Sequence, residues 1–233
     1  MFYFKQFSLS DEKSALKIGT DAVLLGAWAE VTEVDSILDI GTGSGILALM
    51  MAQRTKARID AVEIDTDTAK QARQNIAISP WPGRIRIHVA SFQEFANIQI
   101  QSYDLIISNP PYFSNSLKSP DPGRSRARHD DSLPVNEFMS GIGKLLADSG
   151  QLVVIIPFEA RNSWIMEASL HALMPCRMAS VFPRQGKPPS RLMIEFRKGK
   201  NNAFQEEEIV IRDLNGNYTD HYKRLTYNFY LGL

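Results

Sequence analysis

Four consecutive residues, Asn109-Pro110-Pro111-Tyr112, have the groups needed to hold a planar amine. They follow an apolar run, 104–108, which predicts a buried strand that ends here because two prolines cannot continue strand pairing. The Asn109 side-chain oxygen and the Pro110 carbonyl can each accept one N–H of the amine, so that its lone pair is free to attack. Tyr112 can stack on the ring that carries the amine. The predicted chemistry is group transfer onto an exocyclic amine nitrogen, with these four residues as the catalytic turn.

A glycine-rich turn between a predicted strand and a predicted helix indicates a nucleoside-type cofactor. Gly41 and Gly43 permit a tight turn and close approach of a ligand. Glu63 ends the next predicted strand, where such folds place a carboxylate on ribose hydroxyls. The turn begins with an aspartate and lacks the third glycine of a pyrophosphate site, which favours S-adenosylmethionine over a dinucleotide. The candidate cofactor-binding residues here are Asp39, Gly41, Thr42, Gly43, Gly45 and Glu63.

Short β-branched runs alternate with helical patterns between residues 36 and 196, which predicts an α/β fold of the Rossmann-like kind with a mostly parallel sheet. Strands are expected at 36–41, 57–64, 84–90, 104–109, 151–157, 177–183 and 191–196. Helices are expected around 46–51 and at 65–78, 134–147 and 160–173. The stretch 112–132 has no periodicity, and a loop of that length in a compact domain is usually functional or disordered.

Composition limits the remaining possibilities. The 233 residues are 44% hydrophobic, enough for one sizeable core, and 26 basic residues balance 26 acidic ones. The single cysteine, Cys176, excludes a disulfide framework and a multi-cysteine metal site, which fits a reducing cytoplasm. No signal peptide, membrane span or metal site is predicted.

Segments near both ends of the sequence, taken together with these motifs, resemble those of a known family. Residues 16–28, the Asn109 to Tyr112 turn, Ala127-Arg128-His129 and the tail 218–231 together resemble the bacterial tRNA(Val) (adenine-N6)-methyltransferase family. The resemblance implies a class I methyltransferase fold, with a seven-stranded mostly parallel sheet, helices on both faces and an antiparallel last strand. It implies methylation of the exocyclic N6 of the adenine immediately 3′ of the anticodon, position 37.

The resemblance also assigns further cofactor contacts. Lys17, Thr20 and Asp21 match a segment that lies over the methionine end of the cofactor in similar enzymes. After the third strand, similar sequences usually carry an aspartate that receives the adenine amine, whereas this chain has Ser91 followed by Phe92. Ser91 can accept only a weaker, neutral hydrogen bond.

Basic residues around the catalytic turn predict contacts with tRNA phosphates, through the anticodon stem-loop. The candidate RNA-binding residues are Lys118, Arg124, Arg126, Arg128, His129, Lys187 and Arg191. The aromatic stripe from Tyr218 to Tyr230 could stack on splayed bases, but its spacing favours core packing.

One methyltransferase domain over residues 1–233 is expected, and it is expected to be a monomer. Residues 1–30 are predicted to cover substrate and cofactor, 31–200 to form the catalytic core and 201–233 a tail. Three alternatives stay open: a methyltransferase for a ribosomal RNA guanine or a release-factor glutamine, a nicotinamide oxidoreductase, and a cofactor-binding RNA-interaction protein without turnover.

Overall fold

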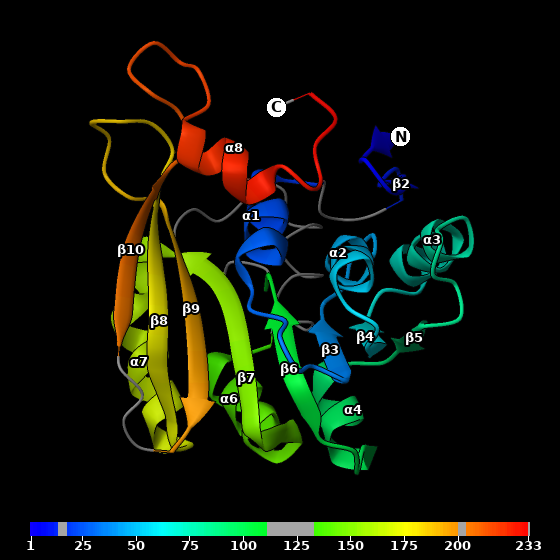
Figure 1. The fold of residues 1–233 in the computed structure, drawn as a ribbon. Helices are drawn as coiled ribbons and strands as arrows, with labels where there is room; N and C mark the ends of the chain where they lie inside the picture. Colours follow the sequence, from blue (N-terminus) through cyan, green and yellow to red (C-terminus); the bar gives the residue numbers. More distant parts are fainter. Residues whose placement is uncertain (14–17, 111–132, 200–203, 233) are drawn as a thin grey trace, which may run out of the picture.

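The computed structural model describes residues 1–13, 18–110, 133–199 and 204–232. Its centre is an eight-stranded sheet in the order β10-β8-β9-β7-β6-β3-β4-β5 (Figure 1). The strands are β3 Ser36–Ile40, β4 Arg58–Glu63, β5 Ile85–Val89, β6 Tyr103–Ser108, β7 Leu146–Pro157, β8 Leu173–Phe182, β9 Arg191–Lys198 and β10 Gln205–Val210. The predicted α/β fold is confirmed.

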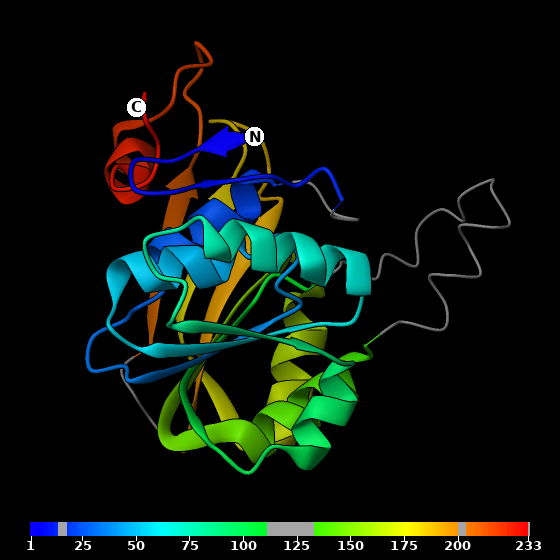
Figure 2. The ribbon, with the colours of Figure 1, turned by 90° about the vertical axis from the view of Figure 1, so that its right-hand side faces the viewer.

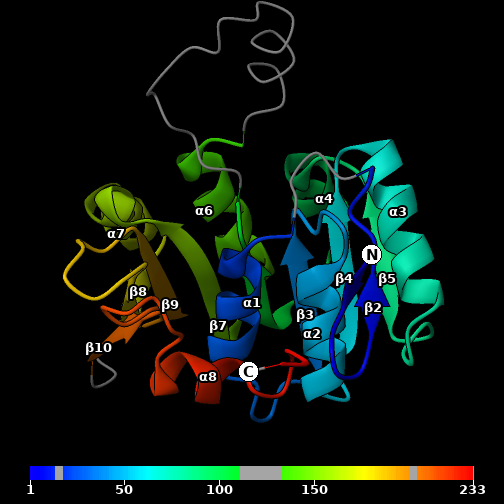
Figure 3. The same cartoon turned by 90° about the horizontal axis from the view of Figure 1, so that it is seen from above.

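Helices cover both faces of this sheet (Figure 3). On one face lie α1 Thr20–Trp28, α2 Ile46–Arg54 and α3 Thr66–Ala77, with α8 Asp220–Thr226 packed on α1. On the other lie α4 Phe92–Ile98, α6 Val135–Leu145 and α7 Arg161–Leu170, which follows the short 3₁₀ helix η1 Phe158–Ala160. Neighbouring residues of the central strands enter opposite cores: Ile37 packs with the first set of helices and Leu38 with the second. Both faces are therefore buried, as a parallel sheet requires.

The strand directions follow the prediction except at one edge. β9 pairs antiparallel with β7 and β8, as expected of the last predicted strand. Beyond it, β10 pairs parallel with β8 and makes eight strands instead of the predicted seven. Its sequence, Gln-Glu-Glu-Glu-Ile-Val, carries three consecutive glutamates and resembles no buried strand. Charged side chains suit an edge strand, because they oppose pairing with another chain.

The two ends of the chain meet beside α1 and α2. A small hairpin, β1 Phe2–Tyr3 with β2 Ser8–Leu9, opens the chain. Phe4 forms an isolated bridge with Tyr230, and the Lys5 N–H donates to the Phe229 carbonyl at 2.8 Å. Figure 2 shows the N-terminal segment running beside the C-terminal one. The expected core packing of the aromatic tail is confirmed at Tyr222 and Phe229, which are 1% and 2% exposed.

None of the helices in the described ranges is long and apolar enough to cross a membrane. The same residues contain no cluster of three or more histidine, cysteine or carboxylate side chains arranged for a metal ion.

Two glycines of α6 provide a matched test of packing between α6 and α4. A Cβ at Gly141 would lie 2.5 Å and 2.7 Å from ring carbons of buried Phe92, whereas one at Gly143 would meet nothing closer than His171 at 3.9 Å. We expect Gly141→Ala to lower the free energy of unfolding by about 1–3 kcal/mol. Gly143→Ala should raise it by about 0.5–1 kcal/mol, because alanine favours the helix. Urea unfolding measures both, and equal shifts would contradict the packing.

Candidate active site

Strand pairing brings the two predicted motifs to the same edge of the sheet. Ile40 of β3 is the partner of Ser108 in β6, and the next residues along the chain are Gly41 and Asn109. The Ser108 hydroxyl donates to the Ile40 carbonyl at 2.8 Å and fastens the two strand ends together. Adjacent strands lie about 5 Å apart, so the catalytic turn begins next to the glycine turn.

The glycine turn has the conformation that its residue types predict. Gly41, Gly43 and Gly45 have φ of 69°, 57° and 88°, values that side chains other than glycine rarely adopt. A Cβ at Gly41 or Gly43 would meet no atom within 4 Å, whereas one at Gly45 would contact Ala72 at 3.6 Å. The first two glycines therefore border open space in which a ligand can approach the backbone. Gly45 lets α2 pack against α3.

Glu63 connects the glycine turn to the end of β4. Its Oε2 accepts from the Gly43 N–H at 2.9 Å, and its Oε1 accepts from the Asp65 N–H at 3.0 Å. A carboxylate can accept about four hydrogen bonds, so capacity for a ligand hydroxyl is left. Its contact with a ribose stays a prediction.

Asp39 supports the turn from inside the protein. It is fully buried, and its Oδ2 accepts from the Thr42 hydroxyl at 2.5 Å and from the Ala48 N–H at 3.1 Å. Its Oδ1 has no hydrogen-bond partner among the described residues. Burial raises the pKa of Asp39 to about 7, and the nearby negative charge of Glu63 adds to the increase. Burial therefore favours the neutral form of this carboxyl, and a positive charge nearby would favour its ionised form.

These observations fit S-adenosylmethionine better than a phosphate-bearing cofactor. The segments 39–45 and 63–65 contain three carboxylates and no lysine or arginine. The turn combines an open backbone, two carboxylates near it and a buried oxygen without a partner. A sulfonium ligand with an ammonium group is attracted to such a site, whereas pyrophosphate is repelled.

Asn75 is a site residue that is not predicted from the sequence. It lies in α3, is 2% exposed, and its amide donates to the carbonyls of Ser10 and Ser44, both at 2.8 Å. Its oxygen accepts from the Ser10 N–H at 2.9 Å. One side chain thus ties the N-terminal segment to the glycine turn. The sequence pattern that could have identified Asn75 is a polar residue on the apolar face of the helix, between Ala72 and Ile76.

The N-terminal segment continues past this connection toward α1. Asp11 is buried, and its carboxylate accepts from the Ile18 N–H at 3.0 Å. Thr20, the first residue of α1, is exposed, while Asp21 pairs with Arg191 at 2.8 Å. The structure thus joins a residue predicted to bind the cofactor to one predicted to bind RNA. Lys187 lies exposed in the β8–β9 connection.

Ser91 and Phe92 have structural functions at the start of α4. The Ser91 hydroxyl accepts from the Glu94 N–H at 3.2 Å, and the Glu94 carboxylate accepts from the Ser91 N–H at 3.0 Å, which forms a capping box. Phe92 is 5% exposed, and its ring lies 5.7 Å from that of Phe138 on α6. Their contact with a cofactor stays a prediction.

Asn109 is partly exposed and Pro110 is buried at the end of β6. The other predicted site residues lie outside the described residues: Lys17, Pro111, Tyr112, Lys118, Arg124, Arg126, Arg128 and His129.

The buried Asp39 predicts a pH dependence of stability in the absence of a ligand. Its folded-state pKa of about 7 exceeds the ordinary 3.8, so the folded protein keeps this proton to higher pH than the unfolded chain does. Raising the pH from about 4 to about 7 should therefore favour unfolding through this group. Asp39→Asn removes the titration and should flatten the profile. Urea unfolding at several pH values tests this, with exposed Asp35→Asn as the control, and an unchanged profile in Asp39→Asn would refute the assignment.

Replacing Asn75 should loosen the glycine turn and the N-terminal segment together. Asn75→Ala leaves the backbone groups of Ser10 and Ser44 without these partners, a cost of about 1–3 kcal/mol. We expect faster amide hydrogen exchange at residues 8–12 and 43–45 than in the wild type. Gln74→Ala, an exposed neighbour on the same helix, is the matched control. Faster exchange in only one of the two segments would show that Asn75 does not couple them.

Known proteins place this arrangement in a family. A family model, the methyltransferase small domain, matches residues 13–174. A predicted O-methyltransferase from Agrobacterium tumefaciens has a TM-score of 0.71 at 18% identity, covering 90% of this chain and 96% of its own. A ribosomal protein L11 methylase from Lactobacillus delbrueckii has a TM-score of 0.56 at 16% identity, covering 76% and 77%. At these identities the likeness concerns the fold.

Two curated relatives carry the sequence comparison further. The tRNA1(Val) (adenine(37)-N6)-methyltransferase of Bacteroides fragilis is 44% identical over 99% of this chain and 97% of the relative. The protein of the same name from Aeromonas hydrophila is 40% identical over 99% and 97%. Because both alignments run nearly end to end, the chain belongs to the tRNA1(Val) (adenine(37)-N6)-methyltransferase family.

Proposed function

We propose that this protein transfers a methyl group from S-adenosylmethionine to N6 of adenine 37 in valine tRNA. The observation that carries the proposal is the pairing of β3 with β6, which sets Asn109 beside the open face of the glycine turn. Full-length relatives that carry this activity in their names support the choice of acceptor. The ribosomal RNA, glutamine and nicotinamide alternatives have no comparable support.

One group of site residues would bind the cofactor, and another would bind the acceptor. Gly41 and Gly43 leave room for the cofactor against the backbone, and Glu63 has acceptor capacity for ribose hydroxyls. Asp39 supports the same turn from inside the protein, through Thr42 and Ala48. Thr20 and Asp21 begin α1, and with Lys17 they are proposed to cover the methionine end.

At the acceptor end, the chain has to restore nucleophilicity to the adenine amine, whose lone pair is delocalised into the ring. The Asn109 oxygen and the Pro110 carbonyl would each accept one N–H and favour a pyramidal nitrogen. Tyr112 would stack on the base and fix its plane. S-adenosylmethionine supplies a methyl carbon that is already activated by its sulfonium. Alignment, rather than a strong general base, is then the main requirement on the protein.

The chain would act as one methyltransferase domain with three parts. Residues 1–30 would cover the cofactor, 31–200 would form the catalytic core and 201–233 a tail that also supplies β10 to the sheet. The anticodon stem-loop would contact Lys118, Arg124, Arg126, Arg128 and His129 around the catalytic turn, with Lys187 and Arg191 farther out. We propose that the enzyme acts as a monomer in the cytoplasm, where tRNA is modified.

Asn109→Ala should separate binding from chemistry. The side chain acts on the reacting amine, so calorimetric affinity for S-adenosylmethionine should be unchanged while single-turnover methylation of tRNA falls about 10²–10³-fold. Asn97→Ala, an exposed asparagine on α4, should methylate at the wild-type rate.

Two results would contradict the proposal. A near-wild-type rate in Asn109→Ala would remove the assigned role of that residue. Calorimetric binding of NAD by the wild type, without binding of S-adenosylmethionine or its demethylated product, would end the methyltransferase assignment.

A further inference from the structure

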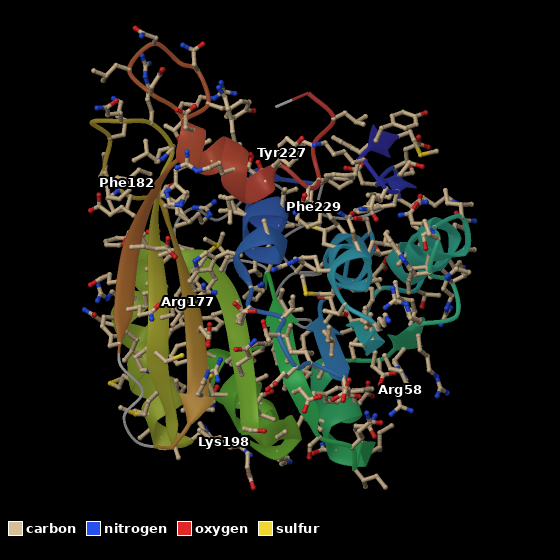
Figure 4. All side chains as sticks on the ribbon, viewed as in Figure 1. Arg58, Arg177, Phe182, Lys198, Tyr227 and Phe229 are labelled. Carbon is tan, nitrogen blue, oxygen red and sulfur yellow. The ribbon has the colours of Figure 1, made fainter. Side chains whose placement is uncertain are left out.

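Two loops far from the catalytic turn rise from the same edge of the sheet. Residues 183–190 follow β8 and residues 211–217 follow β10; we call them the loop pair. β8 and β7 are both antiparallel to β9, so they run in the same direction, and β10 is parallel to β8. Figure 1 shows both loops extending beyond the sheet at the end where α8 lies. In Figure 4, Phe182 lies at this end, and Arg58 and Lys198 lie at the opposite one.

The loops are fixed to each other by hydrogen bonds. The Gln185 N–H donates to the Arg212 carbonyl at 2.8 Å, and the Ile211 N–H donates to the Phe182 carbonyl at 2.9 Å. The Arg184 guanidinium donates to the Leu214 carbonyl. The loop pair is therefore a single preformed surface.

This surface carries positive charge that carboxylates do not neutralise. Arg184, Lys187 and Arg212 are exposed, and none of them pairs with a carboxylate of the described residues. Asp213 is the nearby acid in the chain, and its Oδ1 accepts from the N–H groups of Asn215 and Asn217, both at 2.9 Å. Its carboxylate serves the turn of the second loop. Arg184 and Arg212 each donate to a carbonyl of that loop, Leu214 and Gly216, and a guanidinium has five N–H donors, so both keep donors for an anion.

Arg212 is held in a stack of planar groups. Its guanidinium carbon lies 4.0 Å from the centre of the Tyr218 ring, which stacks on Tyr222 at 4.9 Å with an angle of 18°. Tyr222 is 1% exposed and anchors the stack in the core. Because Arg212 covers one face of Tyr218 and Tyr222 the other, this ring is not a platform for a base. The oriented guanidinium is instead suited to phosphate.

Strand spacing sets the distance between this surface and the catalytic turn. β8 is the third strand from β6 and β10 the fourth, so at about 4.8 Å per strand the loop pair begins about 14–19 Å away. A nucleotide with its base at Asn109 cannot place its own phosphate there. An anion that occupies both places must be longer than one nucleotide.

We propose that the loop pair binds the phosphate backbone of the double-stranded RNA stem that carries the acceptor adenine. The inference rests on the proposed function. Duplex RNA is recognised mainly by shape and by backbone contacts, which matches preformed cations without a base-stacking ring. The loop pair would thereby orient the stem while the catalytic turn receives the unpaired base.

The test compares charge changes at the two opposite ends of the strands. Lys187→Glu/Arg212→Glu alters the loop pair, and Lys56→Glu/Arg58→Glu makes the same charge change at the amino end of β4, where both residues are exposed. Fluorescence titrations at several salt concentrations would use a valine anticodon hairpin and its loop sequence as a single strand. We expect the loop-pair variant to bind the hairpin at least about 10-fold more weakly. The salt slope, which is the slope of log K against log salt concentration, should become less steep by about 2, because two phosphate contacts are lost at roughly 0.9 each. Its single-strand affinity should be unchanged, and the control should keep the wild-type salt slope.

The outcomes separate the inference from the proposed function. If the loop-pair variant keeps the wild-type slope on the hairpin, or loses single-strand affinity equally, the loop pair does not bind the stem. If the wild type neither binds nor methylates tRNA, the proposed function itself fails. If the double variant has a lower melting temperature than the wild type, the single variant Lys187→Glu replaces it, because Lys187 is exposed and its side chain makes no hydrogen bond or ion pair with the described residues. We expect this variant to reduce the salt slope by about 1.

Discussion

The site depends on the register between β3 and β6. Parallel pairing of Ile40 with Ser108 aligns the ends of two strands that lie far apart in the chain, and the hydroxyl of Ser108 closes the junction. A slip of two residues would move Asn109 about 6.6 Å along the sheet. That displacement is larger than any contact distance for transfer between two bound ligands. The register is protected because both faces of these strands are buried, so a slip would disrupt the packing of apolar side chains in both cores.

Elements distant in sequence hold the cofactor end around this junction. Asn75 connects α3 to the N-terminal segment and to the glycine turn, and Asp39 connects the same turn to α2. Asp21 joins α1 to β9 through Arg191. The turn is thus fastened from several sides, while the sides of Gly41 and Gly43 that a Cβ would fill stay open. Rigidity around an open backbone is what a site needs to select a ligand without rearrangement.

What could be predicted from the sequence follows from burial. The seven expected strands are all present because each carries a run of β-branched or other apolar residues, continuous in the central strand β6 and interrupted by charged residues in β4 and β5. β10 escaped prediction because an edge strand tolerates Glu206, Glu207 and Glu208. β7 begins at Leu146 rather than at Gln151, because Leu146 already pairs with Tyr103 of β6, and Asp148-Ser149-Gly150, which looks like a turn, lies in an irregularity before the regular pairing resumes at Gln151. Ser91 suggested an adenine contact, while the capping box that employs it depends on where α4 starts.

The residues that were missed act through tertiary contacts that have no local signature. Asn75 is one polar residue in a helix until the chain near Ser10 folds over it, and the unpartnered oxygen of Asp39 exists only when the turn is closed. The distribution of charge likewise becomes apparent only in the folded protein. A chain with 26 positive and 26 negative residues has no net attraction for RNA, yet the fold separates the signs along one edge of the sheet. Carboxylates gather at the glycine turn, and Arg184, Lys187 and Arg212 gather on the loop pair. A polyanion arriving at this edge is attracted at one end and repelled at the other, so the charge distribution can orient it before any base enters the site.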